Sequence, residues 1–149
     1  MSARSAALRL LTRRDYATSE IRAKLIDREF ASDEIAAAIR SLTEAGLLDD
    51  ARVAAAHVRS ASQIKHRGRL RIRRELETRG LERAIVSQAL AELPEEDEAA
   101  GIEKFLQRKR LPPTLDPGPR RRLFGQLMRR GFSADAIGKA LRKHGRDDE

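Results

Sequence analysis

Apolar residues recur along the chain at the spacing of helix faces, and the whole pattern repeats every 51 residues without a gap. Leu25, Leu76 and Leu127 occupy equivalent positions, and each follows another aliphatic residue by four positions. No stretch alternates apolar and polar residues with the period of a strand. A repeat of this kind fixes the architecture, so the sequence predicts an all-α protein of three tandem three-helix repeats. Because each repeat is too small to bury its apolar face alone, we expect the repeats to stack into an elongated, curved array.

Glycines, prolines and capping residues place the predicted repeats at 1–48, 49–93 and 94–149. The helices expected within them span residues 5–13, 18–29, 32–45, 51–65, 70–79, 83–92, 95–109, 120–131 and 134–143. Four of the five prolines fall between residues 111 and 119, which predicts a loop there. The short tail 145–149 is expected to fray.

The predicted helix ends carry capping chemistry. Gly80 and Gly131 follow the second helices of their repeats, where glycine takes the left-handed conformation without steric cost. Glu29 holds the same position in the first repeat, so we expect a different turn there. N-terminal caps are expected from the side-chain oxygens of Thr18 or Ser19, Asp49 or Asp50, and Ser133.

Charge is distributed unevenly along the 149 residues, whose net charge is +8. Residues 1–50 carry eight Lys/Arg against nine Asp/Glu, so the rest of the chain is strongly basic. Two basic clusters are the candidate binding residues: Arg59, Lys65, Arg67, Arg69, Arg71, Arg73 and Arg74 form the first, and Arg120, Arg121, Arg122, Arg129 and Arg130 the second. Arginine forks suit phosphates and carboxylates alike, so a DNA backbone and an acidic protein surface are both open as partners. A solvated helix face is the alternative reading of each arginine.

Signatures of enzymes, metal sites and membrane spans are missing. The chain has no cysteine, no Gly-Lys-Ser/Thr phosphate loop and no Gly-x-Ser-x-Gly elbow. His57, His66 and His144 have no partner at metal-binding spacing, and no apolar run approaches the ~20 residues of a membrane helix. The sequence therefore predicts a protein that is not an enzyme and has no catalytic, cofactor or metal site.

Several segments resemble the bacterial RecX family of recombination regulators. The resemblance covers about residues 6–144 and is carried by residues 47–54 (LLDDARVA), 58–60, 68–76 (GRLRIRREL) and 79–81, with weaker matches at 20–25, 46–50, 129–133 and Ile137. The chain departs from the family at Val53 and His57, where aromatic residues are frequent.

The resemblance implies a small cytoplasmic protein of three three-helix repeats. It implies a regulator in DNA repair, recombination and the SOS response that binds the RecA recombinase filament on single-stranded DNA. Binding would inhibit the ATPase, filament growth and strand exchange of RecA. We expect a monomer, and any direct contact with single-stranded DNA should depend little on sequence.

A transcription regulator of the helix-turn-helix type is the alternative. It would need a recognition helix that presents Asn, Gln or Arg to base edges. The chain has no Asn, and its four glutamines lie on different predicted helices: Gln63, Gln88, Gln107 and Gln126. A nuclease or another enzyme is disfavoured because the sequence offers no candidate catalytic site.

Overall fold

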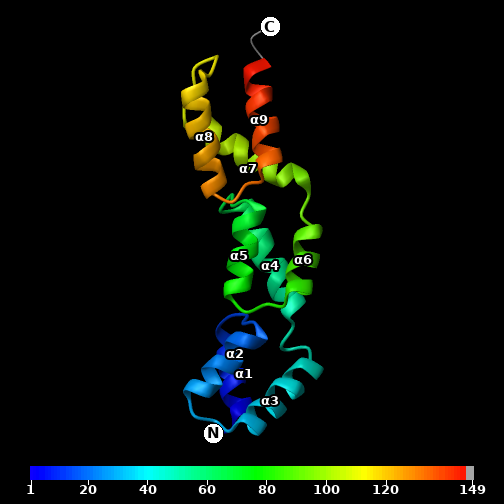
Figure 1. Cartoon of the computed structure of the whole chain (residues 1–149). Helices are drawn as coiled ribbons and strands as arrows, with labels where there is room; N and C mark the ends of the chain where they lie inside the picture. Colours follow the sequence, from blue (N-terminus) through cyan, green and yellow to red (C-terminus); the bar gives the residue numbers. More distant parts are fainter. Residues whose placement is uncertain (147–149) are drawn as a thin grey trace. The chain divides into compact units, whose positions relative to one another are not determined.

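The computed structural model describes residues 1–146, and the regular structure within that range is entirely helical (Figure 1). The elements are α1 (Ala3–Arg13), α2 (Thr18–Asp27), α3 (Ser32–Glu44), α4 (Asp50–Gln63), α5 (Arg69–Thr78), α6 (Arg83–Ala91), α7 (Glu95–Arg108), α8 (Pro117–Arg129) and α9 (Ala134–Arg146). The predicted all-α class with three helices per repeat is confirmed. The predicted fraying tail falls mainly on residues 147–149, which lie outside the described residues.

The chain divides into two compact units. The first contains residues 1–57 and 76–89, and the second contains residues 58–75 and 90–149. The predicted repeat boundaries at 48 and 93, and the elongated, curved array, stay predictions.

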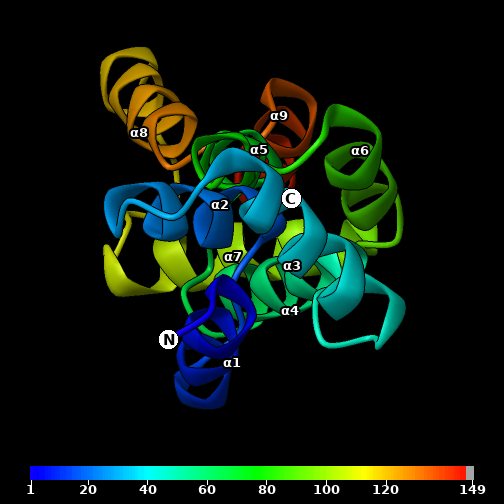
Figure 2. The ribbon, with the colours of Figure 1, turned by 90° about the horizontal axis from the view of Figure 1, so that it is seen from below.

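In the first unit, α1 packs against both α2 and α3 (Figures 1 and 2). Ala3, Ala6 and Ala7 are fully buried on α1, and their small side chains let the neighbouring helices approach closely. The aliphatic face predicted from the repeat lies opposite them, with Ile21 and Leu25 at 0 % exposure. This unit therefore has a thin aliphatic core.

In the second unit, α9 packs against α7 and against α8, which runs in the opposite direction (Figure 1). Phe132 fills the middle of this core at 1 % exposure, among Ile102, Leu127 and Ile137. The turn that follows α8 thus supplies the largest buried side chain of the unit.

Left-handed turns follow α2, α5 and α8. Their φ angles are 66° at Glu29, 81° at Gly80 and 89° at Gly131. In each turn the next amide donates to a carbonyl five residues earlier, as from Phe30 to Leu25 at 3.3 Å. The expectation of a different turn at Glu29 is therefore wrong. The closing hydrogen bond and the packing of Phe30 on the core impose the conformation, and they outweigh the ~1–2 kcal/mol that a Cβ costs there.

The turn after α8 contacts the start of α5 through backbone atoms. Gly68 N donates to Arg130 O at 3.1 Å, and Leu70 N donates to Gly131 O at 2.9 Å. Amides at a helix N-terminus have no partner within the helix, so this turn satisfies two of them. A Cβ on Gly131 would lie 2.4 Å from Arg71 N, and one on Gly68 would lie 2.2 Å from Gly131 C. Both glycines are required by this contact, which we call the α5–turn contact.

The first unit has an equivalent contact, in which Gly80 lies against Ser19. An ion pair reinforces it: Arg79 donates to Glu20 Oε1 from Nη2 at 2.9 Å and from Nε at 3.2 Å. Burial alone would raise the pKa of Glu20, but the hydrogen bonds from Arg79 and from Ala17 N, with the charges of Arg79 and Arg14, together lower this pKa. Glu20 is therefore held as a carboxylate.

Two predicted N-terminal caps are confirmed and one is wrong. Asp49 Oδ1 accepts from Arg52 N at 3.1 Å, and Ser133 Oγ accepts from Ala136 N at 3.3 Å. Thr18 is the first residue of α2 rather than its cap. Its amide donates to Asp50 Oδ1 at 2.8 Å, so a distant carboxylate takes the place of a local cap.

The proline-rich loop is shorter than predicted. We expected a loop over 111–119 and a helix from residue 120, but α8 begins at Pro117. Proline is tolerated in a first helical turn because its missing N–H has no partner there in any case. At the other end of the unit, α9 continues three residues past the predicted end at residue 143.

We predict that Gly131→Ala lowers the free energy of unfolding by at least about 2 kcal/mol, because a Cβ would meet the Arg71 backbone at a positive φ. Gly125→Ala is the matched control. Its Cβ would make only ordinary contact, 3.5 Å from Arg129 Nη1, and alanine favours a helix over glycine by about 1 kcal/mol. Urea unfolding measures both variants, and equal stabilities would contradict the α5–turn contact.

Candidate functional site

All twelve predicted binding residues fall within the second compact unit. The α5–turn contact brings the two basic clusters together, since it joins the backbone of Arg71 in the first cluster to Arg130 and Gly131 at the end of the second. Arg71 thus lies beside the end of the second cluster, although more than 50 positions separate the two in the sequence.

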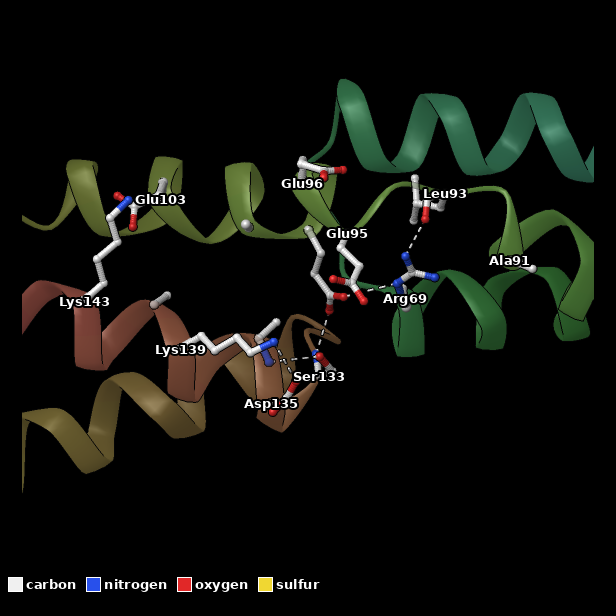
Figure 3. Close-up of a pocket in the computed structure, with 14 residues that line it drawn as sticks. Arg69, Ala91, Leu93, Glu95, Glu96, Glu103, Ser133, Asp135, Lys139 and Lys143 are labelled. Carbon is white, nitrogen blue, oxygen red and sulfur yellow. Dashed lines mark hydrogen bonds and ion pairs between the residues drawn. The ribbon is translucent and has the colours of Figure 1, made fainter.

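Arg69 points into the protein and holds several elements together (Figure 3). Its guanidinium donates to Leu90 O at 2.8 Å and to Leu93 O, and its Nε lies 3.3 Å from Glu98 Oε2. Glu98 is 6 % exposed, and its other oxygen accepts from Ser133 N at 2.7 Å. Arg69 therefore fixes the end of α6 and the start of α9, and its charge is neutralised internally.

A hollow of about 640 Å³ lies beside Arg69, between α7 and α9 (Figure 3). Glutamates of α7, such as Glu95 and Glu103, line one side, and Lys139 and Lys143 of α9 line the other. Lys143 reaches toward Glu103 (Figure 3). The lining includes no cysteine or histidine, and within residues 1–146 no cluster of three metal-ligating side chains occurs. The hollow is lined by charged side chains of both signs.

Other predicted binding residues are also engaged. Arg67 forms an ion pair with Glu75, and Arg120 donates to Leu141 O at 3.2 Å. The guanidinium of Arg130 stacks 4.7 Å from the centre of the Phe105 ring. Arg73 and Arg74 make interactions of their own as well.

The remaining six basic residues are exposed and have no ion pair or hydrogen bond from their side chains in the part of the chain that the structure describes. We call them the open cations: Arg59, Lys65, Arg71, Arg121, Arg122 and Arg129. Three of them, on α8, line a shallow hollow together with Gly118 and Gly125. The two glycines contribute no side chain to this hollow, and the guanidinium groups of Arg122 and Arg129 lie near them. The chemistry available is the binding of phosphates or carboxylates by arginine.

Sequence reasoning missed two cations of the same unit, Lys104 and Arg108 on α7. Both are exposed, and Lys104 Nζ lies 3.4 Å from His66 Nε2. The acidic residues at the start of α7 offset these cations, so the predicted helix as a whole is not basic and no basic cluster was identified there. Their spacing of four residues, which places both on one helix face, is the signal that could have shown them.

Comparison with known proteins gives a consistent result. The model of the second three-helix domain of RecX matches residues 49–90, and the model of the first matches residues 3–42. A regulatory protein RecX from Trichlorobacter lovleyi is 34 % identical over 142 residues, which are 93 % of this chain and 92 % of the relative. The chain belongs to the RecX family.

Another RecX, from Pseudomonas entomophila, is 38 % identical over 150 residues, with 99 % of this chain and 93 % of the relative covered. The crystal structure of RecX from Lactobacillus salivarius matches with a TM-score of 0.86 at 22 % identity, over 95 % of this chain and 94 % of that one. This likeness shows the RecX fold. The relatives are named regulatory proteins, and no helix among residues 1–146 is long and apolar enough to cross a membrane.

We predict that Arg69→Gln destabilises the protein by about 3–5 kcal/mol, because it leaves the buried Glu98 carboxylate unpaired. Arg71→Gln removes an open cation and should change stability by no more than about 0.5 kcal/mol. The free energy of unfolding in urea separates the two variants. Similar losses for both would show that the contacts of Arg69 have no special structural weight.

Proposed function

We propose that this RecX protein binds the RecA recombinase filament on single-stranded DNA and inhibits its ATPase, filament growth and strand exchange. It acts without catalysis, as a cytoplasmic monomer, through surfaces that include the open cations. Family membership supports RecA as the partner. The regulatory names of the relatives favour a binding protein over an enzyme, and the described residues include no cluster of three metal-ligating side chains.

The open cations are assigned as the partner-binding surface on the basis of one observation. The described structure separates arginines that have internal partners from open cations, and the two kinds alternate on the same helices. On α8, Arg120 is held by Leu141 O, whereas Arg121 and Arg122 line the shallow hollow. A charge kept only for solubility would need no such hollow. An extended polyanion, or an acidic protein surface, fits it.

Inhibition of RecA provides the main test. Substoichiometric protein should inhibit ATP hydrolysis by RecA on single-stranded DNA. Reversing three open cations in R121E/R122E/R129E should raise the half-inhibitory concentration about tenfold or more, if each charge contributes about 0.5–1 kcal/mol.

The matched control is R22E/R28E/R40E, which changes the net charge equally at exposed arginines of the first unit. Full inhibition by this control, with loss only in the α8 variant, assigns the surface. Equal effects of the two variants would contradict it, and no inhibition by the folded wild-type protein would contradict the function itself.

Direct contact with DNA should be electrostatic. For single strands, log K falls with log salt at a slope of about −0.7 per phosphate neutralised, so the six open cations alone would contribute a slope of about −4. Fluorescence anisotropy of labelled oligo(dT) and of a mixed-sequence strand, between about 50 and 200 mM salt, measures this slope. A salt-insensitive complex with one particular sequence would instead favour the helix-turn-helix regulator.

A further inference from the structure

Three groups that are cationic, or become so on protonation, meet beside the connection between α4 and α5. His66 lies in that connection, and Lys104 and Arg108 lie on α7. Lys104 Nζ is 3.4 Å from His66 Nε2. Burial first, and then the charges of Lys104 and Arg108, lower the pKa of His66, while a hydrogen bond to the Ser62 backbone opposes them. The free protein therefore favours a neutral ring at this place.

The backbone holds His66 in position. Its φ of 53° is left-handed, a conformation that a residue with a Cβ seldom adopts. The amides on either side stabilise the turn, since Lys65 N donates to Ser60 O at 3.2 Å and Arg67 N donates to Ala61 O at 2.9 Å. Gly101 on α7 lies next to the His66 carbonyl, which brings this helix close to the connection.

The described residues provide no ion-pair partner for the two side-chain cations of this cluster. Within residues 1–146, neither Lys104 nor Arg108 forms an ion pair with a carboxylate. Like charges four residues apart on a helix repel each other. Arg108 lies in the last turn of α7, where the negative end of the helix dipole stabilises its positive charge. Lys104 lies before that turn, and its ammonium group faces a histidine. An anion is the partner that this arrangement lacks.

We propose that His66, Lys104 and Arg108 form a binding site for a phosphate group, supplied by a nucleic-acid backbone or by a free phosphate. The site lies next to the open cation Lys65 in sequence and within the same compact unit, and it extends the DNA contact that the proposed function includes. The side chains of Lys104 and Arg108 donate to the oxyanion, and His66 donates from Nε2 once that atom is protonated. Because the anion favours the protonated ring, binding strengthens as the pH falls.

The test is the pKa of His66, measured by NMR at constant ionic strength in chloride, in sulfate and with (dT)12. Sulfate keeps its charge throughout the titration range and stands in for inorganic phosphate. We expect the bound anion to raise the pKa of His66 by about 1 or more relative to chloride. The affinity for (dT)12 should then increase about tenfold when the pH is lowered from above to below the pKa values of His66 in the free and the bound protein. A rise with (dT)12 alone identifies a nucleic-acid site, and a rise with sulfate alone identifies a site for small anions.

His66→Gly tests the site without disturbing the fold. Glycine adopts the left-handed conformation without the steric cost of a Cβ, so the thermal stability should not fall, whereas the pH dependence of (dT)12 binding should disappear. Glu29→Gly is the matched control, because it relieves the same backbone conformation in the first unit and should keep that dependence. A pKa of His66 that is equal in all three solutions, or full pH dependence in His66→Gly, would overturn the site. RecA is absent from these measurements, so their failure leaves the proposed inhibition standing.

Discussion

The first amides of α5 have no partners within their own helix, and the turn between α8 and α9 supplies them. This α5–turn contact brings two backbones within a distance that leaves no room for a Cβ on Gly68 or Gly131. It therefore fixes the register between α5 and the C-terminal helices of the second unit. The same turn places Phe132 in the core, so hydrogen bonding and apolar burial act on one short segment.

The α5–turn contact also affects how the arginine side chains of the second unit are arranged. A strongly basic unit has to neutralise some of its arginines internally, because a buried cation without a partner is costly. Arg69 meets this requirement through Glu98 and two carbonyls, and Arg67 does so through Glu75. The arginines that remain exposed are then held on helices whose relative register is fixed. In this way the protein separates the charges that hold the unit together from the charges that a partner can reach.

The helices were predictable from the sequence because a 51-residue repeat of apolar positions is a signal of long range, and the caps at Asp49 and Ser133 are local. Glu29 was mispredicted because its intrinsic preference was weighed without the packing of Phe30, which decides the turn. Pro117 was placed in a loop because its tolerance in a first helical turn was not applied. The internal role of Arg69 could not be read from the sequence, since Glu98 lies 29 residues away and outside any helical spacing. The proximity of His66 and Lys104 is likewise a tertiary contact without a local signal.

Hydrogen exchange of two backbone amides tests the α5–turn contact most directly. The amides of Gly68 and Leu70 lie at the start of a helix, where exchange is ordinarily fast because the helix itself offers no acceptor. Since they donate to Arg130 O and Gly131 O, NMR-detected exchange should find them protected to the level of the core amides of α8. Exchange at the rate of an open helix N-terminus would contradict the contact, and with it the placement of Arg71 beside the end of the second basic cluster.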